Sequence, residues 1–185
     1  MPKVGMKNLI YAPLADDGKK YTKAPVKFSG AISIKDDPQK ADEKYYEDDE
    51  LQDSDNSITS SKINLVVSGD EDAVIAEVLG RQYTEADGAE LTNNDNSIFI
   101  GIGYINVVRV KGANKYKPKM HYKVKLEEYS DESKTKEDKT AFQTISLDGT
   151  SYFNSDGKMK WIGKTFDTVE EAALALTAKF VVVTP

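Results

Sequence analysis

Cysteine is absent from this chain of 185 residues, and His121 is its only histidine. The chain therefore forms no disulfides and has no thiolate chemistry, so packing or assembly must supply its stability. Zinc sites built from cysteine and histidine are excluded, and a Ser-His-Asp triad would have to use His121. The nucleophile elbow G-x-S-x-G does not occur in the sequence. We therefore expect a protein that is not an enzyme and that holds no cofactor and no metal.

Long apolar runs are missing as well. No stretch approaches the roughly 20 apolar residues that span a bilayer, and the first residues are already polar. Neither a transmembrane helix nor a signal peptide is expected, which indicates synthesis in the cytoplasm. The content of 39% hydrophobic and 30% charged residues is that of an ordinary soluble protein, and the length fits one domain with its own core.

Each sign of charge is scarce in one part of the chain. Residues 36–58 carry ten acids and only two lysines, a net charge of -8 within a chain whose net charge is -6. Residues 96–126 carry no acid and seven basic residues: Arg109, Lys111, Lys115, Lys117, Lys119, Lys123 and Lys125. Unlike patches attract and like patches repel, so this division favours contact between copies of the chain. The alternative, solvated loops and strand faces, is also common for charge runs.

Apolar periodicity predicts a mainly β protein. Apolar and polar positions alternate strictly over residues 119–126, which predicts a strand with one buried face and places His121 on a lysine-lined polar face. This strand is expected to continue to residue 129. Further strands are expected at residues 8–14, 26–34, 58–67, 98–110, 140–147, 149–153 and 158–164. Asp-Gly turns are expected at residues 17–18, 87–88, 148–149 and 156–157. Residues 36–58 have few large apolar side chains, so a long, mobile acidic loop is expected there.

Two helices are expected. Ser68 with Glu71 forms a capping box for the first, and Gly80 is its C-terminal cap. The apolar stripe of this helix, which should lie against the sheet, is Val74, Ile75, Val78 and Leu79. The second helix runs from Thr168 to about residue 179 and carries few large side chains, so we expect it to dock weakly.

Three short motifs resemble ligand sites but lack a required part. Residues 157–165 have five residues between their glycines, where a phosphate-binding P-loop has four. Gly101 and Gly103 lie in an apolar run without a third glycine, which favours a bend or a close approach of strands over a dinucleotide site. Residues 53–56 lack the glycine and the distal glutamate of a calcium loop.

An ordered set of segments resembles the major tail proteins of long, flexible-tailed phages, of the type found in phages of Gram-positive hosts. One block is Lys-Thr-Lys-Glu at 134–137 with Phe-Gln-Thr-Ile-Ser-Leu-Asp-Gly-Thr at 142–150. The other segments are residues 4–11, 16–18, 30–34, 46–49, 65–80, 86–88 and 98–104. The resemblance covers about residues 3–165, so residues 1–165 are the expected tail tube domain. Residues 166–185 are an expected C-terminal helix and arm, a possible linker remnant whose end resembles the start of a bacterial immunoglobulin-like repeat.

This resemblance implies a structural virion protein of the α+β class, mainly β with one flanking α-helix, in a β-sandwich or barrel. It implies homo-oligomeric rings of six copies with a shared inner β-barrel, stacked into a tube that conducts DNA during ejection. The implied location is the virion tail, assembled in the host cytoplasm. The implied partners are the tape-measure, tail-tip and tail-terminator proteins, and DNA passes through the lumen without specific binding.

We expect the acidic segment of one copy to contact the seven basic residues of another. The acidic side of this interface is Tyr45, Tyr46, Asp48, Asp49, Glu50 and Leu51. The aromatic and leucine side chains would anchor the contact, and the carboxylates would pair with the basic groups. Two alternatives stay open. One is a tube protein of a contractile or type VI-like injection apparatus. The other is a non-viral β-sandwich module for binding or adhesion, or for binding nucleic acid through its lysines and Tyr116.

Overall fold

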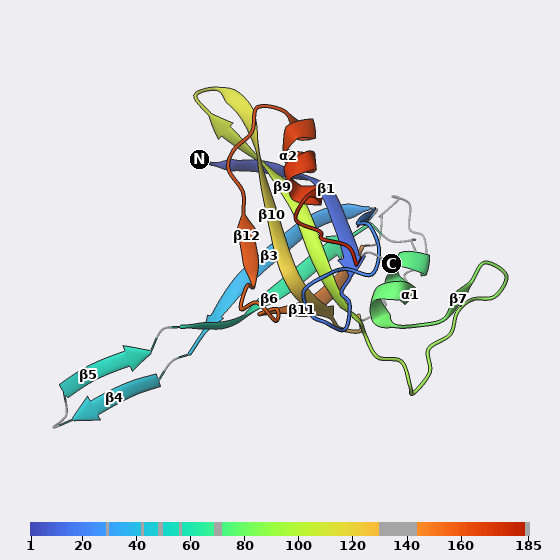
Figure 1. Ribbon diagram of the computed structural model, residues 1–185, viewed down its shortest axis with the longest axis horizontal. Coiled ribbons are helices and arrows are strands. Elements are labelled where there is room, and N and C mark those ends of the chain that lie inside the picture. Colours follow the sequence, from blue (N-terminus) through green and yellow to red (C-terminus); the bar gives the residue numbers. More distant parts are fainter. Residues whose placement is uncertain are drawn as a thin grey trace, which may run out of the picture.

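The computed structural model describes residues 1–28, 30–41, 43–47, 50–55, 57–68, 72–129 and 144–183, and of residues 43–47, 50–55 and 72 it describes the backbone only. This part of the chain forms twelve strands and two helices (Figure 1). The strands are β1 (Lys3–Pro13), β2 (Val26–Lys27), β3 (Ala31–Lys40), β4 (Glu43–Glu47), β5 (Glu50–Asp55), β6 (Ile58–Val67), β7 (Tyr83–Thr84), β8 (Gly88–Ala89), β9 (Phe99–Val110), β10 (Ala113–Leu126), β11 (Ile145–Tyr152) and β12 (Lys160–Ile162). The helices are α1 (Asp72–Leu79) and α2 (Val169–Thr177). The prediction of a mainly β protein with flanking helix is confirmed, with two helices.

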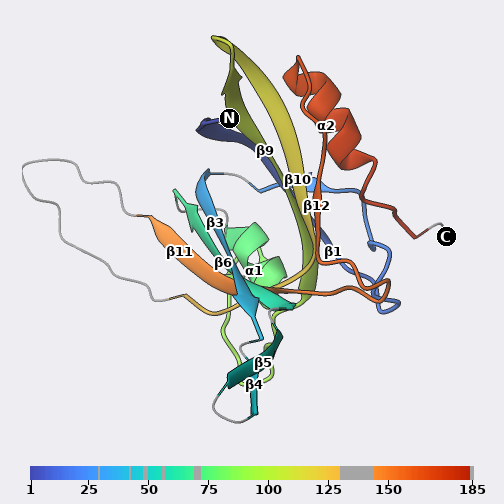
Figure 2. The same cartoon turned by 90° about the vertical axis from the view of Figure 1, so that its left-hand side faces the viewer.

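One open sheet organises the molecule. Its strand order is β2-β1-β9-β10-β11-β6-β3, and β12 pairs with β10. Every pairing in it is antiparallel. The sheet curves so that the half containing β1, β9, β10 and β12 faces the half containing β11, β6 and β3, and α1 lies between them (Figure 2). The described strands do not close into a barrel, because β2 and β3 lie at the two ends of the order.

The main core lies between the two halves of the sheet. In β6 the buried positions are Ile63, Leu65 and Val67, and in β9 they include Ile100 and Ile102. These positions are two residues apart, as expected for strands with one face turned to a core. The same core takes in the apolar side of α1.

Helix α1 covers one end of this core. All four side chains of its expected apolar stripe are in the core or packed against it, and Val78 is fully buried. The helix ends in a Schellman motif, in which the N–H of Arg81 donates to the carbonyl of Ala76 at 2.8 Å. Gly80 follows with a φ of 72°, a value that residues with a Cβ rarely adopt. The C-terminal cap is confirmed, and the capping box lies outside the described residues because it includes Glu71.

A β-bulge divides β10. The register with β9 shifts between His121 and Val124, so side chains on the two sides of the bulge exchange faces. Val124 faces the main core, whereas Met120 faces the outer side of the sheet, and His121 is fully buried. The predicted strict alternation, with His121 on a lysine-lined polar face, is therefore wrong, because one extra residue in a strand reverses its faces.

A second core lies on the outer side of β9 and β10, under α2. Ala172 and Leu176 of α2 are fully buried there beside Met120. Thr168 caps the helix, and its Oγ1 accepts a hydrogen bond from the N–H of Glu171 at 3.3 Å. The helix and its cap are confirmed. The small residues of α2 let the helix lie close to the sheet, and the strength of its docking stays a prediction.

Gly101 and Gly103 make room for this outer layer. A Cβ at Gly101 would lie 2.5 Å from Cε1 of Tyr21, and a Cβ at Gly103 would lie 2.9 Å from Cδ1 of Leu176. The absence of a side chain therefore brings a tyrosine ring and a helix into contact with the sheet backbone. The predicted close approach of strands is therefore wrong in its partner, because a loop residue and a helix approach the sheet at these glycines.

Two other predictions are corrected. Residues 36–58, expected as a loop, instead continue β3 to Lys40 and form the β4–β5 hairpin, which projects from the body as an arm (Figure 1). Paired strands satisfy backbone groups without apolar side chains, so composition alone did not reveal them. The turn expected at 148–149 is also wrong, since Gly149 lies inside β11, where a Cβ would be 2.5 Å from the carbonyl oxygen of Lys125. The other three Asp-Gly turns are confirmed by positive φ values at their glycines.

We expect Val78→Asp to lower the free energy of unfolding by about 3–5 kcal/mol, because its carboxylate would be buried without a partner. Ala73→Asp, at an exposed position of the same helix, is the matched control and should change it by less than about 0.5 kcal/mol. Urea denaturation of both variants measures the difference. A parent-like midpoint for Val78→Asp would show that α1 does not cover the core.

Gly101→Ala should cost about 1–3 kcal/mol of stability, because its Cβ would overlap the ring of Tyr21. That ring is buried, and its hydroxyl donates to the carbonyl of Tyr122 at 2.9 Å, so it has little freedom to move. Gly5→Ala is the control, since a Cβ at Gly5 meets no atom within 4 Å. Thermal melts of the two variants should differ, and equal melting temperatures would contradict the close packing.

Candidate subunit interface

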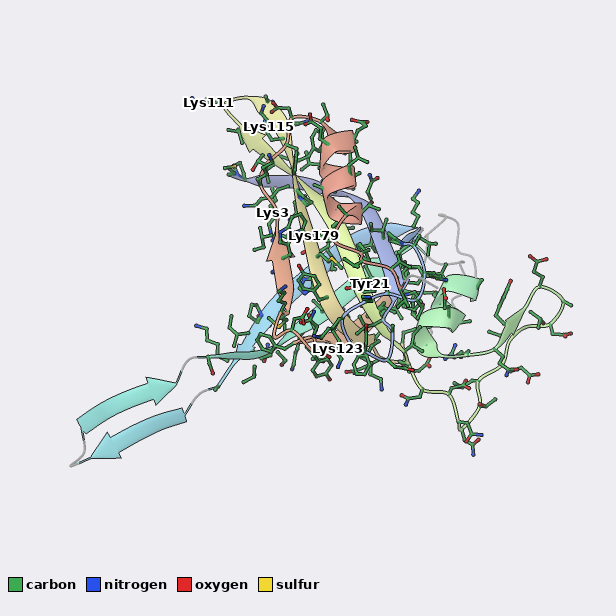
Figure 3. The ribbon with its side chains drawn as sticks, viewed as in Figure 1. Lys3, Tyr21, Lys111, Lys115, Lys123 and Lys179 are labelled. Carbon is green, nitrogen blue, oxygen red and sulfur yellow. The ribbon has the colours of Figure 1, made fainter. Side chains whose placement is uncertain are left out.

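The seven basic residues expected at the interface form three groups along β9 and β10 instead of one face. The first group is Arg109, Lys111 and Lys115, the second is Lys117 and Lys119, and the third is Lys123 and Lys125. Lys111 and Lys115 lie at one end of the molecule and Lys123 toward the other (Figure 3). The length of the two strands separates the groups, and the bulge in β10 turns the third group to a different side.

The first group surrounds the turn between β9 and β10. Lys111 and Gly112 have φ values of 48° and 85°, as in the type I′ turns that join antiparallel strands tightly. The sequence analysis missed this turn because a Lys-Gly pair is not a usual signal for it. Lys115 forms an ion pair with Asp167, whereas Arg109 and Lys111 have no ion pair with any described residue. Within the described part of the chain, the charges of Arg109 and Lys111 therefore remain uncompensated at this turn.

The third group forms a compact patch with aromatic side chains. The Nζ atoms of Lys123 and Lys125 lie 4.3 Å and 5.6 Å from the ring centroid of Phe99. Phe99 packs edge to face on Tyr152 with 6.1 Å between the ring centroids, and both rings are partly exposed. Cation–π contacts hold the ammonium groups over the ring. The patch therefore combines two positive charges with partly exposed aromatic area.

The acidic side of the expected interface is the β4–β5 arm. Its backbone register pairs Tyr45 with Asp53, Tyr46 with Leu51, and Glu47 with Glu50. Asp48 and Asp49 lie between the two strands, outside the described residues. The arm extends away from the basic groups of its own chain (Figure 1). The backbone of this acidic segment therefore lies apart from strands β9 and β10, which carry the basic residues.

Asp36, one of the ten acids, is used inside the molecule. Its carboxylate accepts a hydrogen bond from Oγ of Ser61 at 2.7 Å and forms an ion pair with Lys160. Nε2 of His121 lies 3.9 Å from the same carboxylate, and Nδ1 of His121 lies 3.1 Å from Oγ of Ser151. This polar cluster connects β3, β6, β10, β11 and β12. It was not predicted, because its members lie far apart in the sequence.

The cluster contains a serine, a histidine and an aspartate, as a Ser-His-Asp triad does, but its serine and histidine are not accessible to a substrate. Ser151 and His121 are fully buried, so no substrate carbonyl can reach Oγ of Ser151. Nε2 of His121 has no hydrogen-bond partner among the described residues, and Lys160 already compensates the carboxylate of Asp36. A triad needs that carboxylate to orient the imidazole and an exposed nucleophile. The geometry favours a structural role.

Burial controls the protonation of His121. Removal from water, and then the positive charge of Lys119, lower its pKa from 6.5 to about 4. Asp36 would act in the opposite direction, but its charge is compensated by Lys160. His121 is therefore neutral at pH 7.

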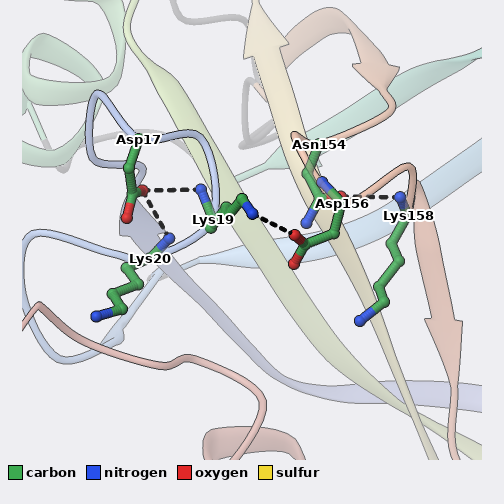
Figure 4. A network of polar contacts seen from close by, with 6 residues as sticks. All are labelled: Asp17, Lys19, Lys20, Asn154, Asp156 and Lys158. Carbon is green, nitrogen blue, oxygen red and sulfur yellow. Dashed lines mark hydrogen bonds and ion pairs between the residues drawn. The ribbon is translucent and has the colours of Figure 1, made fainter.

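Two Asp-Gly turns are joined at one side of the molecule. Asp17 accepts hydrogen bonds from the N–H groups of Lys19 and Lys20 at 2.8 Å and 2.9 Å, and Lys19 forms an ion pair with Asp156 at 2.8 Å (Figure 4). The N–H of Ser155 also donates to the carbonyl of Gly18 at 3.2 Å. Exposed ion pairs contribute only about 0–1 kcal/mol, so these contacts mainly fix one turn against the other.

The C-terminal segment also joins the body. Tyr21 forms a parallel bridge with Val182, in which the N–H of Tyr21 donates to the carbonyl of Val181 at 2.9 Å. The ring of Tyr21 packs on Phe180 with 5.0 Å between centroids. The described end of the chain therefore pairs with its own fold.

No match to the chain was found among protein-family models or among curated protein sequences. Over the described ranges, no group of three or more His, Cys, Asp or Glu side chains is placed to hold a metal ion. The helices in those ranges are too short or too polar to span a membrane.

The pH dependence of stability should report on His121. Because its pKa is lower in the folded state than in the unfolded chain, stability is fully present above about pH 6.5 and is lost as the pH falls toward about 4. At about 1.4 kcal/mol per pKa unit, the loss is roughly 3 kcal/mol. Urea denaturation between pH 7 and pH 4 should show a shallower loss for His121→Gln, which keeps a partner for Ser151 but does not titrate. The same slope in both proteins would contradict the buried neutral histidine.

Proposed function

We propose that this protein is a tail tube subunit of a siphophage-like particle, whose copies form rings that stack into a hollow tube for DNA. The resemblance of about residues 3–165 to major tail proteins is the starting point. Among the structural observations, the open edges of the sheet give the strongest support for this proposal.

Both ends of the sheet leave backbone groups without a strand partner. Among the described strands, β3 pairs only with β6, and β2 pairs only with Ile10 and Tyr11 of β1. An exposed edge as long as the 10 residues of β3 is a template for another strand unless it is covered. In a ring each copy would add its edge to the next, so that the joined sheets close and no edge remains. This arrangement accounts for a sheet that is curved but not closed within one chain.

The charged projections supply a contact between rings. The β4–β5 arm carries acidic residues, and the β9–β10 turn at another end of the molecule carries Arg109 and Lys111 without ion pairs to described residues. Acidic arms repel one another and are attracted to the basic turns, so contact in one polarity is favoured. Stacking in one polarity produces a tube of uniform bore. A neutral or acidic lumen would keep the phosphates of DNA from the wall.

Assembly tests this proposal. Sedimentation over a range of protein concentrations should show association that weakens as salt is added, because salt screens the pairs between arm and turn. Removing three charges from the arm with Asp48→Asn, Asp49→Asn and Glu50→Gln should weaken association strongly. The matched control removes three charges from the exposed β7–β8 region with Glu85→Gln, Asp87→Asn and Glu90→Gln. Undiminished association of the arm variant, or an equal loss in the control, would contradict the arm contact.

A nucleic-acid-binding module is the second candidate, and the patch of Lys123, Lys125, Phe99 and Tyr152 favours it. Lysines beside exposed rings can hold phosphates while a ring stacks on a base. A mobility shift of a DNA fragment at low salt that is lost in Lys123→Gln would support this candidate. No shift at low salt, together with tube formation, would support the tail tube. A tube protein of a contractile or type VI-like apparatus remains a variant of the first proposal.

A further inference from the structure

A groove lies where β1 and β3 approach each other across the space between the two halves of the sheet. Its volume is about 380 Å³. One wall comes from β1 at Lys3, Gly5 and Met6, and the other comes from β3 at residues 32–36. Tyr104 and Asn106 of β9 and Lys119 of β10 complete the lining. This is the polar end of the space between the two halves of the sheet, away from the part of the core that α1 covers.

The groove carries an excess of positive charge. Lys3, Lys35 and Lys119 line it, and Asp36 is the one carboxylate among its lining residues. Asp36 is already in an ion pair with Lys160, whereas the three lining lysines have no ion pair with any described residue. The charge of the lysines is therefore uncompensated by the part of the chain that the structure describes.

The ammonium group of Lys3 lies close enough to affect Lys119, which also lines the groove, and Lys160 beside it. Burial, and then the charge of Lys3, lower the pKa of Lys160, and the same two causes together with Lys117 lower the pKa of Lys119. Crowding like charges at partly buried sites is unfavourable, and an anion placed between them would remove the repulsion. Lysine ammonium groups, each with three N–H donors, are common partners of phosphate and carboxylate oxygens.

Asn106 supplies a second, independent indication of a ligand. The residue is 7% exposed, lines the groove, and its side-chain amide forms no hydrogen bond with a described residue. It lies two positions after Tyr104 in β9, so the two side chains share the face that is turned to the groove. Its amide atoms are not among the fully enclosed polar atoms that lack a partner, so they keep contact with solvent and are open to a ligand in the groove. An oxygen atom of a bound group would accept from the amide NH₂.

We propose that this groove binds a phosphate or carboxylate group, with the ammonium groups of Lys3 and Lys119 and the amide of Asn106 as donors. The group comes either from a small free anion or from an acidic side chain of another copy of the chain. The site goes beyond tube formation and does not depend on it, because all of its residues come from one chain.

Inorganic phosphate is the probe. It is titrated at constant ionic strength, with sodium chloride making up the balance, while the melting temperature and the NMR signal of the Asn106 side-chain amide are followed. We expect a saturable rise in melting temperature and a saturable shift of that signal in the parent protein. Lys119→Met should lose both responses while melting at or above the temperature of the parent without phosphate, since it removes repulsion. Lys20→Met, which removes the same charge from an exposed loop, should respond like the parent.

Sedimentation with and without phosphate distinguishes the two sources of the group. If the group is a free anion, phosphate leaves the association state unchanged. If it is a carboxylate of another copy, phosphate weakens association and Lys119→Met weakens it as well. The proposal is overturned if the phosphate response is equal in all three proteins, or if it is absent from the parent and Lys119→Met associates normally. Failure of tube assembly alone leaves the phosphate titration unaffected, so the two proposals fail separately.

Discussion

The β-bulge between His121 and Val124 is the constraint on which the rest of the structure depends. Because of the bulge, one strand of 14 residues contributes apolar side chains to two cores. Before the bulge, Met120 faces α2, and after it Val124 and Leu126 face the main core. It also divides the edge of β10 between two partners, β12 at residues 119–121 and β11 at residues 123–126. The sheet follows β11 away from β12, and its two halves come to face each other. A straight β10 would leave either α2 or the main core without its apolar side chains.

The neighbouring strand β9 explains why the space between the two halves of the sheet is polar at one end. Along β9 the inward side chains change from Ile102 through Tyr104 to Asn106, so the space between the halves is apolar beside α1 and polar farther away. The apolar end is closed by the helix. At the polar end, Asp36 forms an ion pair with Lys160 beside His121. The lysines that line the groove between β1 and β3 have no such partner among the described residues. The groove at this polar end is therefore available to a ligand or to another copy, because its residues are not part of the apolar core.

Local chemistry was sufficient to predict part of this fold. The cap glycine and apolar stripe of α1, the bounds of β6, and three Asp-Gly turns follow from residue types at short spacing. The bulge could not be predicted, because strict alternation over residues 119–126 is compatible with an unbroken strand. The burial of His121 could not be predicted either, since Asp36 and Ser151 reach it only through strand order. For the candidate interface, composition located the charges, but the length of β9 and β10 decided that the basic residues form three groups. The pairing of β4 with β5 could not be predicted from apolar content, because it is made by backbone hydrogen bonds.

Electron microscopy of the purified, concentrated protein tests the central claim most directly, because the open sheet is proposed to be completed by neighbouring copies. The account predicts rings of uniform diameter and hollow tubes built from them. Separate compact particles of monomer size at every concentration, with no rings at low salt, would contradict it.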